Sequence, residues 1–153
     1  MIKKLMANDQ SPSRRLLVID DEENMRHMLS ALLTKSGYDV DLAADGREGL
    51  KVLDQDHYDF ILCDIKMPNM GGMEFLEAAG ERIKETTVIM MSAYGTIETA
   101  IEAMKLGAMD LIEKPADLAT IVERIKSAKA EKIILVEKKS EARIRDILKR
   151  KGW

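Results

Sequence analysis

Cysteine, proline and aromatic residues are scarce in this chain: its 153 residues include one cysteine, three prolines and 4% aromatic side chains. The lone cysteine, Cys63, excludes an intramolecular disulfide. Because it lies in an apolar run, we expect it to pack as a small buried side chain. No apolar stretch approaches the roughly 20 residues that a membrane-spanning helix requires. The fold must therefore depend on a hydrophobic core.

Neither sign of charge is in large excess, because the formal net charge is only −3 at pH 7. We therefore expect no direct binding of nucleic acid by the main domain. Residues 138–151 carry seven basic and two acidic side chains, which suits an acidic partner or, more commonly, a solvated helix face. The N-terminal segment 1–13 is polar, lacks the apolar core of a signal peptide and is expected to be flexible. A cytoplasmic protein is the resulting expectation.

The residues that are present, 46% hydrophobic and 33% charged, are typical of a soluble globular protein. The length suits one domain with a tail, and we predict a domain over residues 14–130 and a helical linker or tail over residues 131–153. Apolar residues in this tail recur at roughly heptad spacing, so it could pair with a second copy, although two heptads are fewer than a coiled-coil assignment needs. They are Ile133, Val136, Ile144 and Ile147.

Short apolar runs alternate with segments of helical periodicity along most of the chain. Five βα repeats with short connections predict an α/β fold: a doubly wound five-stranded parallel sheet, flavodoxin-like with strand order 2-1-3-4-5, flanked by five helices. A polar interruption in the second strand favours an edge position. The predicted strands are 16–19, 38–43, 60–63, 88–91 and 111–112, and the predicted helices are 23–35, 47–53, 73–83, 97–106 and 117 to at least 129.

Polar residues stand at the carboxyl ends of four of these five strands, where active sites of such sheets lie. Asp20 and Asp21 follow the first strand, Asp64 the third, Ser92 the fourth and Lys114 the fifth. If the strands are parallel neighbours, the three carboxylates converge and repel one another unless a cation lies between them. The pattern therefore predicts a Mg²⁺-dependent site that accepts a phosphoryl group.

Mg²⁺ prefers oxygen ligands and usually keeps several waters. Asp21 and Asp64 could supply carboxylates, Asp20 could anchor a metal-bound water, and the backbone carbonyl of Lys66 could complete the set. With the ion bound, Asp64 could attack phosphorus and become an aspartyl phosphate.

The charge that develops on the transferring phosphoryl group needs further partners. The Lys114 ammonium and the Ser92 hydroxyl suit two of its oxygens. Taken singly, Ser92 could equally form a turn, Lys114 could be a surface charge, and Asp20 or Asp21 could cap the following helix. The bond from Lys114 to Pro115 is a candidate cis peptide, with an ordinary trans turn as the alternative.

Three segments and their spacing resemble the receiver domain of bacterial two-component response regulators over residues 14–128. They are VIDDEENMR, LCDIKMPNMGGMEFL and MMSAYGTIETAIEAMKLGAMDLIEKP. The last looks most similar to receivers of NtrC-like regulators that activate sigma-54 transcription. The resemblance implies that a sensor histidine kinase donates the phosphoryl group. It also implies that Asp64 is the phosphoacceptor, Asp20 and Asp21 hold the metal, Ser92 is the switch hydroxyl and Lys114 binds phosphate.

Two features depart from that family pattern. Family members usually carry Tyr or Phe three residues before the lysine, whereas this chain has Leu111, which puts the aromatic switch in doubt. Tyr94, two residues after Ser92, could shape the access of water to the phosphoryl group instead. NtrC-like regulators continue into an ATPase and a DNA-binding domain, but no P-loop motif G-x-x-x-x-G-K-[ST] occurs here.

Phosphorylation is expected to change the 94–128 face and thereby control an output, with transcription favoured through an effector domain or downstream protein. The alternative is a stand-alone adaptor or phosphorelay receiver. The 97–128 face or the C-terminal helix is a candidate homodimer surface. We expect catalysis only of the chain's own phosphorylation and dephosphorylation.

Two other classes of protein fit less well. An aspartyl phosphatase usually needs an acid where this chain has Lys66. A flavodoxin-like electron carrier needs a loop that accepts an anionic cofactor after the first strand, and DDEEN would repel one.

Overall fold

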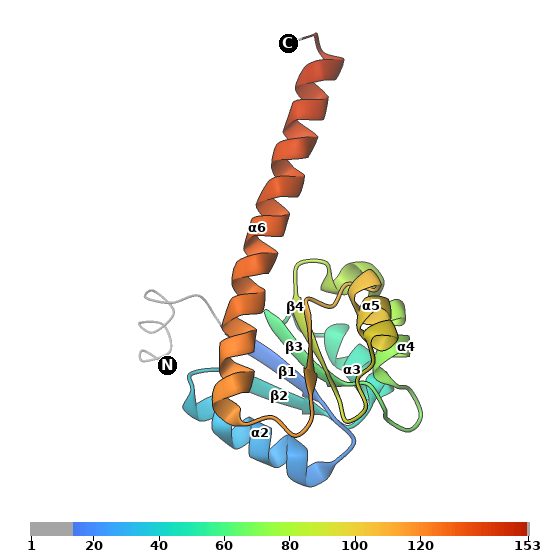
Figure 1. Cartoon of the computed structure of the whole chain (residues 1–153), viewed down its shortest axis with the longest axis vertical. Helices are drawn as coiled ribbons and strands as arrows, with labels where there is room; N and C mark the ends of the chain where they lie inside the picture. Colours follow the sequence, from blue (N-terminus) through green and yellow to red (C-terminus); the bar gives the residue numbers. More distant parts are fainter. Residues whose placement is uncertain (1–13, 153) are drawn as a thin grey trace.

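Five parallel strands form one sheet in the computed structural model of the protein, which describes residues 14–152 (Figure 1). The sheet order is β2-β1-β3-β4-β5, which confirms the predicted doubly wound topology and the edge position of the second strand. The predicted flexible segment 1–13 lies outside the described residues. The strands are β1 (Arg15–Ile19), β2 (Asp39–Ala43), β3 (Phe60–Asp64), β4 (Thr87–Ser92) and β5 (Asp110–Glu113).

Five α-helices within the described residues cover the two faces of the sheet, as predicted. Helices α2 and α6 pack with Leu16 and Val18 on one face, whereas α3, α4 and α5 pack with Leu17 and Ile19 on the other. This division follows from the alternation of side chains along a strand. The helices are α2 (Glu23–Lys35), α3 (Gly46–Leu53), α4 (Gly72–Ala79), α5 (Ile97–Lys105) and α6 (Leu118–Arg150).

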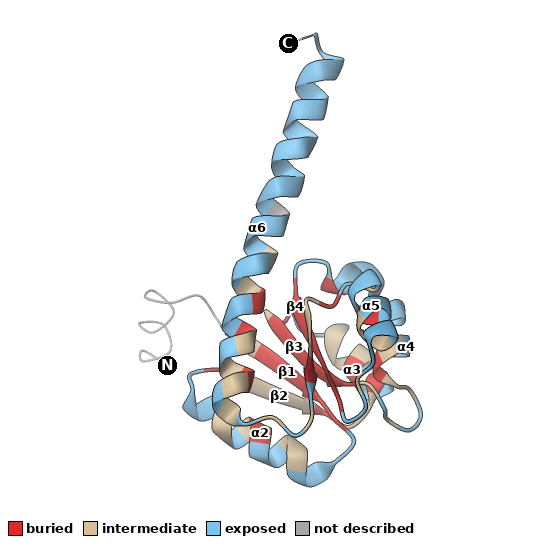
Figure 2. Cartoon of the chain, viewed as in Figure 1, coloured by how far each residue is buried: buried red, intermediate tan, exposed pale blue. Residues whose placement is uncertain are grey.

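The central strands are buried along their whole length, as Figure 2 shows for the middle of the sheet. Helices on both faces exclude water from β3 and β4, which explains their nearly continuous apolar sequences. Cys63 in β3 is fully buried, and this confirms the prediction from its apolar surroundings. The buried strands hold their carboxyl ends in fixed positions beside one another.

Two predicted helices differ from the structure by more than one residue at their carboxyl ends. The helix predicted over 73–83 stops at Ala79, because Gly80 adopts a positive φ of 47°, and a 3₁₀ helix, η1 (Gly80–Ile83), follows. The last helix is longer than the predicted minimum, and its second half projects away from the sheet (Figure 1).

The predicted boundary at residue 130 falls inside the continuous helix α6. Beyond that point the described side chains are mostly exposed (Figure 2). Ile133, Ile144 and Ile147 are 49%, 57% and 40% exposed. The division into a domain and a tail, and the pairing of two such helices, stay predictions.

Candidate functional site

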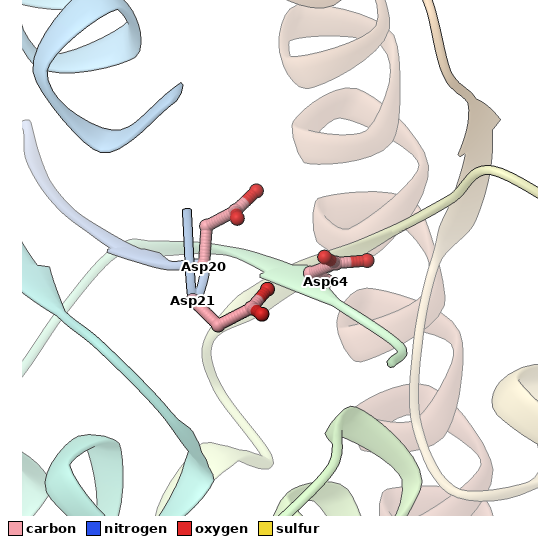
Figure 3. A group of neighbouring side chains, drawn as sticks. All are labelled: Asp20, Asp21 and Asp64. Atoms are coloured by element: carbon pink, nitrogen blue, oxygen red, sulfur yellow. The ribbon is translucent and has the colours of Figure 1, made fainter. Parts of the chain in front are cut away.

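The acidic residues predicted from the strand ends come together at one edge of the sheet. Asp20 directly follows β1 and Asp64 ends β3, its neighbour in the sheet. Figure 3 shows the side chains of Asp20, Asp21 and Asp64 gathered at this edge. Each residue places a carboxylate oxygen within 4.8 Å of an oxygen from the other two. The expected convergence of three carboxylates is therefore present in the structure.

Lys114 reaches this acidic cluster from the end of β5. Its Nζ lies 2.8 Å from Oδ2 of Asp20 and 3.2 Å from Oδ2 of Asp64. The backbone N–H of Lys114 donates to the carbonyl of Ser92 at 2.8 Å, so the ends of β4 and β5 stay in register. The peptide bond from Lys114 to Pro115 is cis, which confirms the candidate named from the sequence.

Burial makes the charges of this cluster costly. The side chains of Asp20 and Asp64 are 0% and 11% exposed, whereas Asp21 lies at the surface. Three carboxylates and one ammonium leave a formal charge of about −2 when all are ionised. Oxygen donors with this charge fit a small divalent cation such as Mg²⁺.

The pKa values follow from the same geometry. Burial raises the pKa of Asp64, and the charges of Asp20 and Asp21 add to the rise, although Lys114 opposes it. Burial works against the charged form of Lys114, but its hydrogen bond to Asp20 and the charge of Asp64 outweigh this and raise its pKa. Lys114 therefore stays a cation beside these carboxylates.

Neither Asp20 nor Asp21 acts as the side-chain cap of helix α2. The capping position is Glu22, which forms no side-chain capping hydrogen bond. Oδ1 of Asp20 accepts a hydrogen bond from the backbone N–H of Glu22 at 2.9 Å, and the Asp20 carbonyl accepts one from Nη1 of Arg26 at 2.8 Å. These bonds fix the turn that carries Asp20 and Asp21 and leave Oδ2 of Asp20 to Lys114.

A pocket of about 350 Å³ lies beside the acidic cluster. Ser92 is buried in it, and its Oγ accepts a hydrogen bond from the backbone N–H of Tyr94 at 3.1 Å. Tyr94 is 79% exposed, and Nζ of Lys66 lies 5.6 Å from the centre of its ring, so these two side chains form the outer rim. The lining residues are Glu22, Asp64, Ile65, Lys66, Ser92, Ala93, Tyr94, Thr99 and Lys114.

Leu111, the residue at the usual aromatic position, lies outside this lining. It is half-buried in β5 and packs against the core formed with α3, α4 and α5. A Cβ atom at Gly95 would lie 3.1 Å from Cδ2 of Leu111, so the leucine lies directly against the loop that follows Ser92. Its part in a switch stays a prediction.

One contact near the site was not predicted from the sequence. Nδ2 of Asn69 donates to Oδ2 of Asp45 at 3.0 Å, which joins the loop after Asp64 to the turn before α3. The MPNMGG segment signals a turn around Asn69. Its partner, however, stands 24 residues earlier, where local sequence patterns give no pairing signal.

A doubly wound parallel sheet with buried carboxylates and a lysine at its carboxyl edge defines a flavodoxin-like α/β protein with an acidic pocket whose oxygen atoms suit a metal ion. The chain belongs to the response regulator receiver domain family, which matches residues 16–126. The resemblance noted from the three sequence segments is thereby confirmed. No described helix is long and apolar enough to cross a membrane.

Curated relatives are longer regulators. The chain is 41% identical to the regulatory protein AtoC of Escherichia coli K12 over 104 residues, which is 68% of this chain and 23% of AtoC. It is 36% identical to the transcriptional regulatory protein ZraR of the same organism over 115 residues, 75% of this chain and 26% of ZraR. The chain therefore spans about a quarter of the length of these relatives.

Solved structures agree with this assignment. The beryllofluoride-activated NtrC4 receiver domain dimer is 34% identical with a TM-score of 0.72, covering 78% of this chain and 98% of that one. A response regulator of Burkholderia pseudomallei, with a phosphorylated aspartic acid, calcium ion and citrate, is 25% identical with a TM-score of 0.72, covering 92% and 86%. The likeness to receivers of NtrC-like regulators is confirmed.

Proposed function

We propose that Asp64 accepts a phosphoryl group from a sensor histidine kinase in a Mg²⁺-dependent reaction. The observation that carries this proposal is the buried Asp64 carboxylate, which Lys114 contacts at 3.2 Å at the edge of an acidic cluster. Membership of the receiver family and the phosphorylated aspartic acid of the Burkholderia structure support it.

Asp21 and Asp64 would hold the metal ion directly, Asp20 would anchor a metal-bound water, and the Lys66 carbonyl would supply a further oxygen. The three carboxylates fit this role because their oxygens lie close together and carry more negative charge than Lys114 offsets. When bound, Mg²⁺ would neutralise the charge of a phosphoryl oxygen.

The transfer forms a bond between a carboxylate oxygen of Asp64 and phosphorus while the bond from phosphorus to the imidazole nitrogen of the kinase breaks. Nζ of Lys114 lies 3.2 Å from Oδ2 of Asp64, so it can contact an oxygen of the incoming phosphoryl group. The Ser92 hydroxyl accepts from the Tyr94 N–H, so its own proton can be donated to another oxygen. Water later cleaves the acyl phosphate, and the chain catalyses only these two reactions on itself.

The response would pass through Ser92, Tyr94 and Leu111 to the 94–128 face. A phosphoryl group adds about −1.5 to −2 charge and new acceptors at Asp64, which would draw Ser92 and the loop that Leu111 supports. Helix α5 on this face exposes Ile97 and Ile101 by 81% and 50%, so a rearranged α5 has apolar surface to offer a partner.

The output we propose is control of transcription through an effector domain or downstream protein. The similarity to ZraR, a transcriptional regulatory protein, supports this proposal. A stand-alone adaptor is the alternative. A homodimer through the 97–128 face would form only with beryllofluoride and Mg²⁺, whereas one through α6 would form without them. Molar mass from light scattering, measured with and without beryllofluoride and Mg²⁺, distinguishes these two dimers.

The direct test of phosphoryl acceptance is incubation with acetyl phosphate and Mg²⁺, read by intact mass. We expect a gain of one phosphoryl group in the wild type and none in Asp64→Ala. Asp20 also contacts Lys114, but it is fully buried and does not line the pocket, whereas Asp64 does. Asp54→Ala, an exposed aspartate on the far end of α3, should behave as the wild type. A gain that persists in Asp64→Ala would refute the assignment.

A further inference from the structure

The loop 65–71, which follows Asp64 and contains Lys66, is closed at its base. The backbone N–H of Gly72 donates to the carbonyl of Ile65 at 2.8 Å. The N–H of Ile65 donates to the carbonyl of Met91 in the neighbouring strand β4 at 3.0 Å. The two ends of the loop are therefore fixed by the sheet and by α4. Its far side, around Asn69, requires other contacts.

Two hydrogen bonds attach this far side to the turn before α3. Nδ2 of Asn69 donates to Oδ2 of Asp45 at 3.0 Å, and the N–H of Gly46 donates to the carbonyl of Met70 at 3.0 Å. The approach is close, since a Cβ atom at Gly46 would lie 2.9 Å from the Met70 carbonyl. Asn69 has a φ of 67°, a left-handed conformation that asparagine tolerates better than most residues.

Asp45 is itself held rigidly by helix α3. Its Oδ1 accepts a hydrogen bond from the N–H of Glu48 at 2.9 Å, and Oε2 of Glu48 accepts one from the N–H of Ala44 at 3.2 Å. The first bond caps the start of α3, and the second ties Glu48 back to the residue before the cap. Asp45 thus connects the start of α3 to the loop after Asp64.

We propose that the hydrogen bond between Asn69 and Asp45 is a positioning contact that sets the affinity of the acidic cluster for Mg²⁺. The inference rests on the proposed function, in which the Lys66 carbonyl is a metal ligand. A carbonyl on a loop binds a metal well only when the loop is held in the binding conformation. Outer contacts of this kind change metal affinity by about 10- to 100-fold in buried sites. Because the bond between Asn69 and Asp45 is exposed to solvent, we expect a change of about threefold to tenfold in the Kd.

The test uses calorimetric titration of Mg²⁺ into the metal-free chain. Asn69→Gly keeps access to the left-handed backbone and removes the side chain with its amide, so its Kd should rise about threefold to tenfold. Asn69→Asp sets two carboxylates against each other and should raise the Kd at least as much. Adding Asp45→Asn to Asn69→Asp restores a donor and an acceptor in swapped positions, and its Kd should return to within about twofold of the wild type.

Phosphorylation by acetyl phosphate gives a second reading. At low Mg²⁺ the rate of Asn69→Gly should fall with its affinity, and saturating Mg²⁺ should restore the wild-type rate. Asp54→Asn, which breaks an exposed ion pair with Arg82 at the other end of α3, is the matched control with unchanged Kd.

Unchanged Kd values in both Asn69 variants would overturn the inference and leave the bond a structural one. If both Asn69 variants bind Mg²⁺ more weakly but the Kd of the swapped pair does not return toward the wild-type value, the inference is also overturned. Absence of Mg²⁺ binding by the wild type would instead contradict the proposed function, so the two failures are distinguishable.

Discussion

The two edges of the parallel sheet both gather aspartates around one basic side chain, but in opposite surroundings. At the carboxyl edge, Lys114 contacts Asp20 and Asp64 at 2.8 and 3.2 Å. At the amino edge, Arg15 at the start of β1 contacts three aspartates at 3.7, 2.8 and 3.0 Å. These three are Asp39, Asp41 and Asp56.

Burial separates the two clusters. The aspartates around Arg15 are 59%, 43% and 47% exposed, whereas Asp20 and Asp64 are 0% and 11% exposed. Water and salt screen the exposed charges, so that cluster needs no further cation. The buried carboxylates lose their hydration and gain only one ammonium in return. Burial, more than the number of acids, therefore separates the proposed site for Mg²⁺ and phosphate from the surface network around Arg15.

The largest expected effect comes from removing the basic side chain at the carboxyl edge, with the one at the amino edge as the control. Lys114→Met should slow phosphorylation by acetyl phosphate about 10²- to 10³-fold, because it removes a cation that meets charge developing in the transition state. Arg15→Met should leave the rate within about twofold. Initial rates of mass gain measure both, after circular dichroism has shown that both variants fold. Equal rates in the two variants would remove the proposed distinction between the edges.

Stabilisation of the fold by Mg²⁺ should depend on the aspartates of the carboxyl edge only. Mg²⁺ at about 100 times its Kd should stabilise the wild type by about 2.7 kcal/mol, because it binds the folded chain alone. Asp21→Asn should lose most of this gain, and Asp56→Asn at the amino edge should keep it. Urea unfolding with and without Mg²⁺ measures the difference. Loss of the gain in Asp56→Asn would show that the metal binds elsewhere.

The smallest expected effect is on stability without metal. Burial raises the pKa of Asp64 in the folded chain, aided by Asp20 and Asp21 and opposed by Lys114. The folded state therefore holds this proton more tightly than the unfolded state, and the contribution of Asp64 to stability falls as pH rises through the raised pKa. At pH 7, Asp64→Asn should gain on the order of 1 kcal/mol, and the gain should vanish at acid pH.

Asp39→Asn at the amino edge is the control for this measurement. Its carboxylate is 59% exposed and lies 3.7 Å from Arg15, so the change in unfolding free energy should stay within about 0.5 kcal/mol. Urea unfolding at several pH values gives both results. A loss of stability in Asp64→Asn at pH 7 would contradict the direction of the pKa shift.

Local sequence patterns were sufficient for the sheet and for the acidic cluster. The apolar runs that precede Asp20 and Asp64 are short, and the residue that ends each run marks the end of a strand. Parallel order then places those ends at one edge, so Lys114 could be assigned to the same site although it lies 94 residues from Asp20.

Other features depend on contacts that a local pattern does not contain. The bond between Asn69 and Asp45 requires the register of a loop against a helix from another repeat. The hydrogen bond from the Tyr94 N–H to Oγ of Ser92 depends on the backbone conformation after β4. The sequence predicted α6 to at least residue 129 and left its end open, because its exposed second half has too weak an apolar pattern to indicate where the helix ends.

The central claim is that the buried carboxylate of Asp64 is the phosphoryl acceptor. The most direct measurement is treatment with acetyl phosphate and Mg²⁺, reduction of the acyl phosphate with borohydride, and peptide mapping by mass spectrometry. The account predicts a single modified position, Asp64, that disappears when Mg²⁺ is chelated. Modification at Asp20 or Asp21, or at exposed aspartates such as Asp41 independent of Mg²⁺, would contradict it.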